Sequence, residues 1–226
     1  MTLIVHNTGL TEYSDALRLQ RDVHRRVVEG RAEDTLLLLE HPPTITVGKS
    51  GSLDNILVSE DKLAERNISL LFTDRGGDVT YHGPGQLVAY PVINLKKRGM
   101  NAHRYVHDLE EVVIRTLSDF SIESYRDETH AGIWVENHEI GAIGINLRRW
   151  VTTHGIALNV NIDLAPFSLI NPCGFTDRKA TSIAEILARE MPISEVTEKF
   201  LTRFTEVFET QLKPVENQLP AGGAGE

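Results

Sequence analysis

The chain has 226 residues, of which 41% are hydrophobic and 24% charged, a balance that predicts one large or two small soluble globular domains with a substantial core. Its 23 basic and 32 acidic residues leave a net charge of −9, which argues against nucleic acid as a partner because phosphate contacts need concentrated Lys and Arg. No apolar run approaches about 20 residues and no basic region precedes residues 1–6, so we expect no membrane contact and a cytoplasmic location.

The first third of the chain predicts strands alternating with helices. Strands are expected over residues 3–7, 35–40, 44–47 and 68–72, and helices over residues 13–29 and 59–66. Ser14 is the expected cap of the first helix and Gly30 its stop. The run over residues 35–40 is apolar without alternation, which predicts a strand covered on both faces.

The densest motif spans residues 74–87 and reads Asp-Arg-Gly-Gly-Asp-Val-Thr-Tyr-His-Gly-Pro-Gly-Gln-Leu. Glycine permits positive φ and close approach of main chain to a ligand, so the motif predicts a loop folded around a bound molecule. Arg75, Tyr81 and His82 are expected to face that molecule, and a long hairpin loop without a ligand is the alternative. The motif lacks the Gly-Lys-Ser/Thr ending of a P-loop and the spacing of a dinucleotide-binding loop.

The rest of the chain predicts the same mixture of elements. Strands are expected over residues 86–94, 132–135, 140–147, 150–153 and 156–162, and helices over residues 101–117, 182–189 and 194–212. Asn101 is the expected cap of the first of these helices. The pattern indicates one α/β (α+β) domain over residues 1–212, with mixed sheets and flanking helices. The tail over residues 213–226 has nothing to bury and is expected to be disordered.

Cys173 is the single cysteine, which excludes an internal disulfide and a cysteine zinc cluster within one chain. It lies between Pro172 and Gly174, a turn context that exposes sulfur, whereas a structural cysteine usually sits in an apolar periodic run. This context favours a reactive thiol over a structural one.

Four motifs in the same order resemble the lipoyl(octanoyl) transferase family. They are residues 75–91, Ala142-Ile-Gly-Ile145, Thr153-His-Gly-Ile-Ala-Leu-Asn-Val160 and Asn171-Pro-Cys-Gly174. The resemblance implies a fold like that of biotin and lipoate protein ligases. It also implies a reaction in which an octanoyl or lipoyl group passes from acyl carrier protein to a thioester on the cysteine, and then to a lysine of a lipoyl domain. This is the first step of endogenous protein lipoylation.

Partners and cofactors follow from the same resemblance. The donor it implies is octanoyl-acyl carrier protein, and the acceptors are lipoyl domains of 2-oxoacid dehydrogenases and the glycine cleavage H protein. No metal or other cofactor is expected, and the chain is expected to act as a monomer. Because carrier protein is acidic, docking would need a basic patch, either Arg148 with Arg149 or the helix residues Arg21, Arg25 and Arg26; both are alternatively solvated surface.

The residue types suit this chemistry. A cysteine divides acyl transfer from a thioester to an amine into two easier steps, and backbone N–H groups of the glycine-rich segments can stabilise the oxyanion. The resemblance places the catalytic thiol at Cys173. The other candidate catalytic residues are His82 and His154, expected beside it, which either relay a proton or pin loops, and Glu139. The residues implied in acyl binding are Arg75, Gly76, Gly77, Asp78, Val79, Thr80, Tyr81, His82, Ala142, Ile143, Gly144, Gly155, Ile156 and Ala157. The small residues among them leave room for an acyl chain or reflect close packing.

Glu139 departs from the family, which carries a lysine there that lowers the pKa of the cysteine. A carboxylate near a thiol raises that pKa. Glu139 could point to solvent while His82 or His154 activates Cys173, could orient a histidine, or could accept the proton of the attacking lysine. Lys49 and Lys179 are the spare lysines near the motifs, and Lys179 is the candidate to substitute for the missing one. An ATP-dependent lipoate-protein ligase and a catalytically impaired homologue that only binds acyl groups or lipoyl domains are the alternatives to the transferase.

Overall fold

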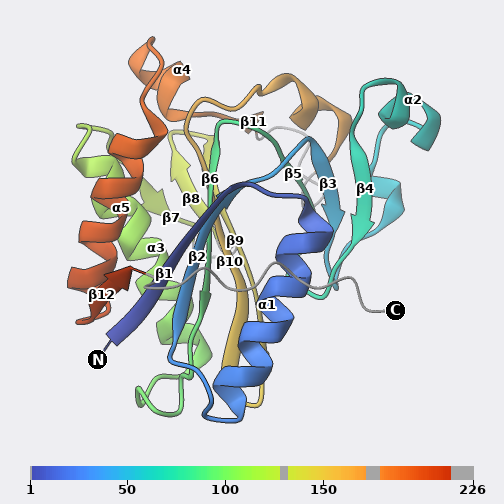
Figure 1. Ribbon diagram of the computed structural model, residues 1–226. Coiled ribbons are helices and arrows are strands. Elements are labelled where there is room, and N and C mark those ends of the chain that lie inside the picture. The colour runs from blue at the N-terminus through green and yellow to red at the C-terminus, as the bar shows by residue number, and fades with distance from the viewer. Residues whose placement is uncertain (1, 128–131, 172–178, 215–226) are drawn as a thin grey trace, which may run out of the picture.

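The computed structural model of the protein describes residues 2–127, 132–171 and 179–214, and its strands form two sheets (Figure 1). The strands of the larger sheet are β1 (Thr2–Leu10), β2 (Thr35–Glu40), β6 (Gln86–Val92), β7 (Tyr125–Arg126), β8 (Gly132–Val135), β9 (His138–Arg148), β10 (Val151–Asn159), β11 (Lys179–Ala180) and β12 (Gln211–Pro214). The smaller sheet contains β3 (Thr44–Val47), β4 (Ser69–Phe72) and β5 (Val79–His82).

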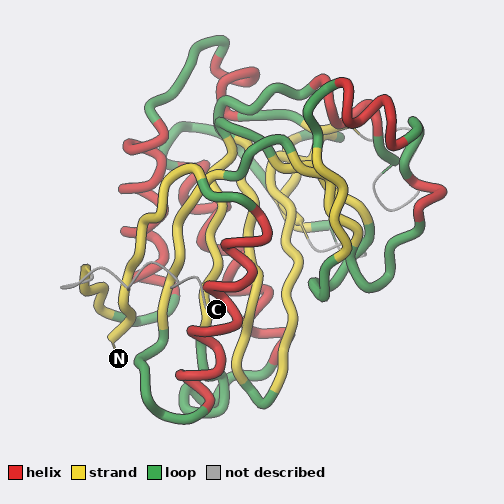
Figure 2. The backbone as a smooth tube through the Cα atoms, turned by 45° about the vertical axis from the view of Figure 1, so that its right-hand side comes forward, coloured by secondary structure: helices red, strands yellow, loops and turns green. Residues whose placement is uncertain are grey.

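The larger sheet has the order β12-β1-β2-β6-β10-β9-β8-β7, with β11 paired to β9, and the smaller one has the order β4-β3-β5. Both sheets are mixed, because β12, β1 and β2 run parallel to one another while β2, β6, β10 and β9 pair antiparallel. Figure 2 shows the two groups of strands side by side. The mixed sheets agree with the expected α/β (α+β) class.

Helices cover both faces of the larger sheet. They are α1 (Tyr13–Val28) on one face and α3 (Ala102–Ser118) with α5 (Ile193–Val207) on the other. Helix α2 (Glu60–Glu65) packs against β4 of the smaller sheet, and the other helical elements are α4 (Ile183–Leu187) and the 3-10 turns η1 (Leu53–Asn55) and η2 (Ala165–Leu169). In β2, Leu36 and Leu38 join the core under α3 and α5, while Leu37 and Leu39 join the core under α1. This confirms that the 35–40 run is covered on both faces.

Two predicted helix ends differ from the structure. The residue that caps α1 is Glu12 rather than Ser14, which lies inside the first turn, whereas Asn101 caps α3 as expected by accepting a hydrogen bond from the Arg104 N–H. The last helix ends at Val207 and not at residue 212, because Glu209 adopts a positive φ of 47° that turns the chain into β12. Strand β12 reaches Pro214, two residues beyond the expected end of the domain, and residues 215–226 lie outside the described part of the chain.

Strand β10 is one strand, although the sequence predicts two separated at residues 154 and 155. The interruption is a break in the pairing with β6, where Pro91 has no N–H to donate and His154 has a φ of 57°. Side chains replace the missing ladder bonds: the Thr152 hydroxyl donates to the Pro91 carbonyl over 2.7 Å and accepts from the Ile93 N–H over 2.9 Å. The pairing of β10 with β9 continues without a register shift through this point.

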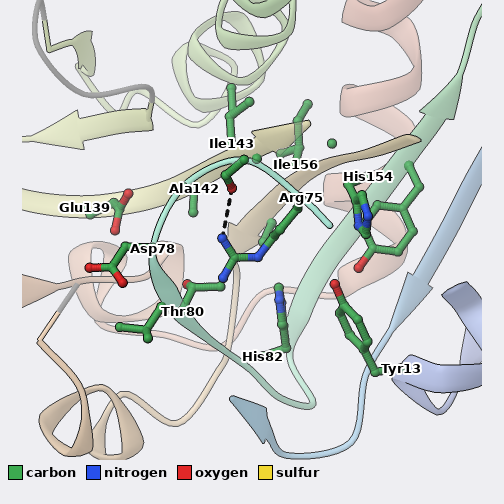
Figure 3. A pocket seen from close by; sticks show the side chains of 17 residues that line it. Tyr13, Arg75, Asp78, Thr80, His82, Glu139, Ala142, Ile143, His154 and Ile156 are labelled. Atoms are coloured by element: carbon green, nitrogen blue, oxygen red, sulfur yellow. Dashed lines mark hydrogen bonds between the residues drawn. The ribbon is translucent and has the colours of Figure 1, made fainter. Parts of the chain in front are cut away.

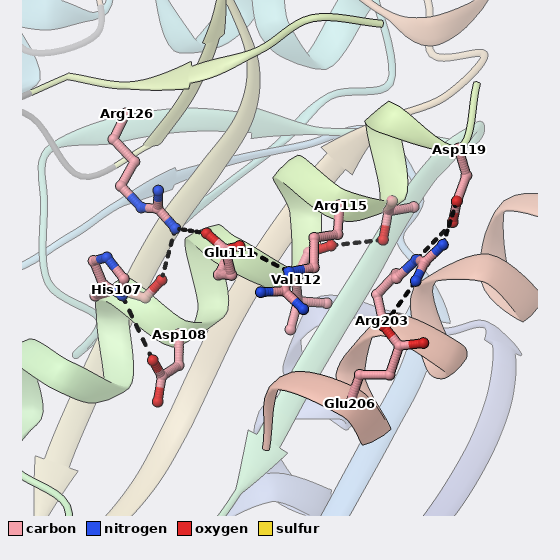
Figure 4. Close-up of polar contacts among 10 residues, drawn as sticks. His107, Asp108, Glu111, Val112, Arg115, Asp119, Arg126, Arg203 and Glu206 are labelled. Carbon is pink, nitrogen blue, oxygen red and sulfur yellow. Dashed lines mark hydrogen bonds and ion pairs between the residues drawn. The ribbon is translucent and has the colours of Figure 1, made fainter. Parts of the chain in front are cut away.

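Polar contacts join α3 to its neighbours (Figure 4). Arg203 of α5 donates through Nε to Asp119 at the end of α3 over 2.9 Å, and this interaction lowers the pKa of the Asp119 carboxyl. Arg126 of β7 pairs with Glu111 and, over 3.2 Å, with Glu110. Exposed ion pairs stabilise little, so the attachment of α3 rests mainly on its apolar stripe. Within the described residues, no helix is both long and apolar enough to cross a membrane.

Candidate active site

A pocket lies between the smaller sheet and strands β9 and β10 of the larger one (Figure 3). It encloses about 650 Å³ of space not filled by protein atoms, part of it open to solvent. Its lining consists of Tyr13, Arg75, Gly76, Gly77, Asp78, Val79, Thr80, His82, Tyr90, Glu139, Ala142, Ile143, Gly144, His154, Gly155, Ile156 and Ala157. Thus nearly all of the residues expected to bind the acyl group do line one cavity.

The sequence predicts that residues 74–87 form a single loop between two strands, and the structure differs. Residues 79–82 form β5, which pairs antiparallel with β3 in the smaller sheet, and short turns precede and follow it. Alternation along β5 then sends Tyr81 away from the cavity, where its ring packs edge-on against Phe167 at a centroid distance of 5.4 Å. The Tyr81 side chain is therefore not part of the pocket wall.

The glycines of the motif let backbone approach backbone. The Gly76 N–H donates to the Ile145 carbonyl of β9 over 2.8 Å, and a Cβ on Gly144 would lie 2.9 Å from the Gly76 carbonyl oxygen. Gly77 has a φ of 86°, which only glycine adopts without strain. The close approach that the sequence predicts is thus made to β9, which forms the opposite wall of the pocket.

Arg75 fixes this segment to the smaller sheet. Its Nη2 donates to the Thr46 carbonyl over 2.8 Å, its Nε donates to the Thr46 hydroxyl over 3.1 Å, and its Nη1 donates to the Gly76 carbonyl over 3.1 Å. The guanidinium is buried and always charged, so it places a fixed positive charge beside the cavity. That charge adds to the burial that lowers the pKa of His82 and of His154.

His82 is a neutral imidazole held by an amide. Gln86 donates from Nε2 to Asn159 over 2.9 Å, which leaves its Oε1 to accept from His82 Nδ1 over 2.8 Å. Burial lowers the pKa of His82 well below its usual value, and His41 lowers it further. At neutral pH the Nε2 atom therefore carries a lone pair, 3.5 Å from the Thr46 hydroxyl.

His154 is held by a carboxylate at the pocket edge. Its Nε2 lies 2.9 Å from Asp74 Oδ1, and Asn146 donates to the other oxygen of Asp74 over 2.8 Å. The hydrogen bond from His154 lowers the pKa of Asp74 to about 2, whereas burial outweighs the carboxylate and lowers the pKa of His154. His154 is therefore a neutral donor through Nε2, and its buried Nδ1 has no hydrogen-bond partner among the described residues.

Cys173 lies outside the described residues, but both flanks of its segment are placed. The Asn171 N–H donates to the Asn55 carbonyl over 2.8 Å, and the Asn55 amide donates to Asp78 in the pocket wall. On the other flank, Lys179 and Ala180 pair with His138 and Glu139 of β9. The two flanks thus meet the pocket at the end where Glu139 and Asp78 lie, opposite His154 and Tyr13 in Figure 3.

Glu139 lines the pocket and is not turned away into solvent. Its register partner in β11 is Ala180, so alternation places Lys179 on the other face of the sheet, where it is exposed. Lys179 therefore does not take the place of a lysine at position 139. Lys49, the other spare lysine near the motifs, donates to Asn146 over 2.8 Å at the opposite end of the glycine segment.

Tyr13 and Tyr90 also line the pocket, and sequence reasoning missed both. Tyr13 begins α1 and Tyr90 lies inside an apolar strand. In both sequence contexts a tyrosine is expected to pack in the core. The available signal was a tyrosine within an otherwise apolar strand, because a buried phenol needs a polar partner. Here that partner is His41, whose Nε2 lies 2.8 Å from the Tyr90 hydroxyl.

The described residues contain no group of three or more His, Cys, Asp or Glu side chains arranged to hold a metal ion. What they form is a narrow slot with small side chains along two paired strands, aromatic groups at one end and two carboxylates at the other. Such a slot suits a slender apolar chain that carries its reactive group at the carboxylate end.

Comparison with known proteins agrees with this geometry. Residues 12–205 match the lipoyl protein ligase A/B catalytic domain. The chain is 44% identical over 220 residues to an octanoyltransferase of Caldicellulosiruptor saccharolyticus, covering 96% of this chain and 94% of that protein. It is 47% identical over 210 residues to an octanoyltransferase of Chloroflexus aurantiacus, covering 92% of this chain and 94% of that protein.

Solved structures with the same fold are more distant in sequence. A bi-partite lipoate protein ligase from Thermoplasma acidophilum superposes with a TM-score of 0.74 over 95% of this chain and 86% of that chain at 16% identity. A biotin protein ligase from Aquifex aeolicus superposes with a TM-score of 0.54 at 17% identity, over 92% of this chain and 70% of that chain. These likenesses show the fold, whereas the octanoyltransferases match at high identity over nearly their whole length. The chain therefore belongs to the lipoyl(octanoyl) transferase family and is an acyltransferase built on the catalytic fold of biotin and lipoate protein ligases.

Proposed function

We propose that the chain takes an octanoyl group from acyl carrier protein, holds it as a thioester on Cys173, and passes it to a lysine of a lipoyl domain. The observation that supports this proposal is the slot between β9, β10 and the glycine segment, whose carboxylate end receives both flanks of the Cys173 segment. An acyl chain lying in the slot would carry its carbonyl at that end.

Each half-reaction is an exchange at the acyl carbonyl. In the first, the Cys173 thiolate attacks the donor thioester, a new C–S bond forms, and the carrier leaves as a thiolate. In the second, the neutral amine of the acceptor lysine attacks, the C–N bond forms, and the Cys173 thiolate leaves. The nitrogen of the addition intermediate loses one proton, which must be taken up by a nearby base.

We propose that Glu139 is the base that takes up this proton. Its carboxylate lines the pocket at the end where the acyl carbonyl would lie, and its strand partner brings no lysine to this face. A nitrogen bearing a formal positive charge after attack is acidic enough to lose a proton to a carboxylate. His82 and His154, which the sequence suggests as relays, lie toward the opposite end and are bound to Gln86 and Asp74.

The test is the intact mass of the protein after incubation with octanoyl-loaded acyl carrier protein, beside a Cys173→Ser control. We expect a gain of one octanoyl group that is absent from the control, is released by hydroxylamine, and is transferred when the lipoyl domain of a 2-oxoacid dehydrogenase or glycine cleavage H protein is added.

Parallel reactions separate the alternatives. Labelling of the lipoyl domain that requires ATP and free octanoate, and persists in Cys173→Ser, would instead identify a lipoate-protein ligase. Binding of octanoate without labelling under either condition would identify an impaired homologue. Glu139→Gln should acylate Cys173 at least as fast as the unmodified protein, because a negative charge near the thiol is removed, but it should transfer to the lipoyl domain more slowly, since the second half-reaction uses the carboxylate as its base.

A further inference from the structure

We propose that Tyr13, His82, Tyr90 and His154 form a rigid stop at the inner end of the pocket, and that this stop limits the bound acyl chain to about eight carbons. The proposal rests on the proposed function for the direction of the chain, with its carbonyl near Glu139 and its methyl end at the stop. We call these residues the aromatic stop.

The aromatic stop is assembled from separate elements that meet at one place. Tyr13 comes from α1, His82 from β5, Tyr90 from β6 and His154 from β10. Ring centroids of Tyr13 and His82 lie 5.6 Å apart, and those of Tyr90 and His154 lie 6.0 Å apart. His41 lies behind them, 4.8 Å from Tyr13 and 5.5 Å from His82 between ring centroids. Figure 3 shows Tyr13, His82 and His154 gathered at the end of the pocket opposite Glu139.

The stop can face an alkyl chain because most of its polar atoms are bonded elsewhere, His154 Nδ1 being a buried atom that has no partner among the described residues. The Tyr90 hydroxyl is bound to His41, the Tyr13 hydroxyl donates to Thr73 over 3.3 Å, and His82 Nδ1 is bound to Gln86. His154 uses Nε2 on Asp74. The lowered pKa values of His82 and His154 leave both rings uncharged at neutral pH. Ring carbons can therefore meet a methyl group without desolvating a charge.

The length of the slot matches a short acyl chain. The small-residue wall pairs Ala142 with Ala157 and Gly144 with Gly155, and the next pair is Ile145 with His154. From the Ala142 pair to the His154 pair is three strand residues, or about 10 Å. Because three backbone bonds span about 3.5 Å, the seven C–C bonds of an eight-carbon acyl group span about 8 Å. A chain of twelve carbons would have to displace the stop.

Displacement is costly because the stop is fully packed. The exposed fractions are 2% for Tyr13, 4% for His82, 4% for Tyr90 and 1% for His154. Each ring holds a hydrogen bond to a residue of another segment, so moving one ring breaks that bond and disturbs its neighbours. An apolar end wall would yield more easily, since it has only packing to lose.

The experiment measures binding of free fatty acids of six to fourteen carbons by calorimetry, and transfer of the matching acyl groups from carrier protein by mass spectrometry. For the unmodified protein, affinity should rise about fourfold for each methylene up to eight carbons and stop rising beyond that length. Tyr13→Ala should move the limit to ten or twelve carbons and strengthen binding of the twelve-carbon acid at least about tenfold.

Leu19→Ala is the matched control, because Leu19 lies on the same helix and packs into the core under α1 but not into the pocket. Its chain-length profile should equal that of the unmodified protein. Tyr13→Leu replaces Tyr13→Ala if the larger deletion prevents folding, and should shift the limit in the same direction.

A steady rise in affinity through fourteen carbons in the unmodified protein, or an unchanged limit in both Tyr13 variants, would overturn the proposal. Failure of the proposed function gives a different result. If no acyl group of any length is transferred while fatty-acid binding still stops rising at eight carbons and Tyr13→Ala moves that limit, the aromatic stop stands and the transfer reaction does not.

Discussion

Glu139 stands where the family resemblance leads us to expect a lysine, and the structure places it in the pocket wall. Gly132 of the neighbouring strand β8 lies against this side chain: a Cβ there would lie 2.9 Å from Glu139 Oε1, so an alanine would make the carboxylate shift. A negative group at the carbonyl end should oppose formation of a thiolate nearby.

Glu139→Lys tests that electrostatic effect. Replacing the carboxylate with an ammonium should lower the pKa of the Cys173 thiol and speed its alkylation by iodoacetamide at neutral pH, by up to about tenfold for each pKa unit. The rate would be followed by intact mass. Glu136→Lys makes the same charge change in the exposed turn between β8 and β9 and should leave the rate unaltered. Equal rates in the two variants would remove Glu139 from the control of the thiol.

At the scale of elements, the break in β10 shapes the site. Gly155 follows His154 at the point where Pro91 interrupts the ladder, and it lets β10 and β6 approach closely: a Cβ there would lie 2.3 Å from the Ala89 carbonyl oxygen and 2.7 Å from the Pro91 ring. The obstacle is backbone, which cannot move aside as a flexible side chain can. Close packing therefore requires the small residue, and the same residue also lines the cavity.

Gly155→Ala should therefore destabilise the protein by about 1–3 kcal/mol, the usual cost of overpacking. Urea unfolding followed by circular dichroism measures the change. Gly141→Ala is the control on the neighbouring strand, because a Cβ there meets its nearest atoms at 3.5 Å or more, which is ordinary contact. A loss of stability in Gly141→Ala as large as that in Gly155→Ala would show that the close approach to β6 is not the cause.

Periodicity predicted most of these elements because their patterns are local. The strands at residues 35–40 and 44–47 and the start of α3 after Asn101 follow from apolar runs and capping residues. Pairing across long distances was not predictable in the same way. Strand β12 is too short and too polar to signal itself, and it exists because β1 offers a free edge. Likewise β5 lies hidden in a glycine-rich motif, since its partner β3 is over thirty residues away.

At the scale of the whole molecule, the pocket depends on segments far apart in the sequence. The glycine segment supplies one wall, β9 and β10 the other, and α1 and β6 the inner end. The motifs predicted the two walls because they carry the family resemblance. Tyr13 lies outside them, and Tyr90 lies inside the first motif but was not expected in the site; both line the pocket where α1 packs over β6. The same packing buries three histidines in one cluster, and this has a consequence for stability.

Stability should fall as the pH is lowered from about 6.5 toward 4, because of this cluster. Burial lowers the pKa of His41 to about 4, and the pKa values of His82 and His154 are lowered too. An unfolded chain binds these protons near its ordinary pKa of about 6.5. The contribution of these neutral histidines to the free energy of unfolding is thus complete above pH 6.5. It is lost as the pH falls toward their pKa values in the folded protein. His41 alone should account for about 3 kcal/mol. The Asp74 carboxyl, with a pKa of about 2, takes up its proton and loses its contribution to stability only at lower pH.

Urea unfolding between pH 7 and pH 4.5 measures this loss, with His41→Gln as the informative variant. The substitution should lower stability at pH 7, since it disturbs the contact with Tyr90, but it should make the decline toward acid shallower because one titrating group is gone. His103→Gln removes an exposed histidine at the start of α3 and should keep the full slope. If His41→Gln declines as steeply as the unmodified protein, the acid sensitivity comes from elsewhere, and the remaining buried histidines, His82 and His154, would be substituted in turn.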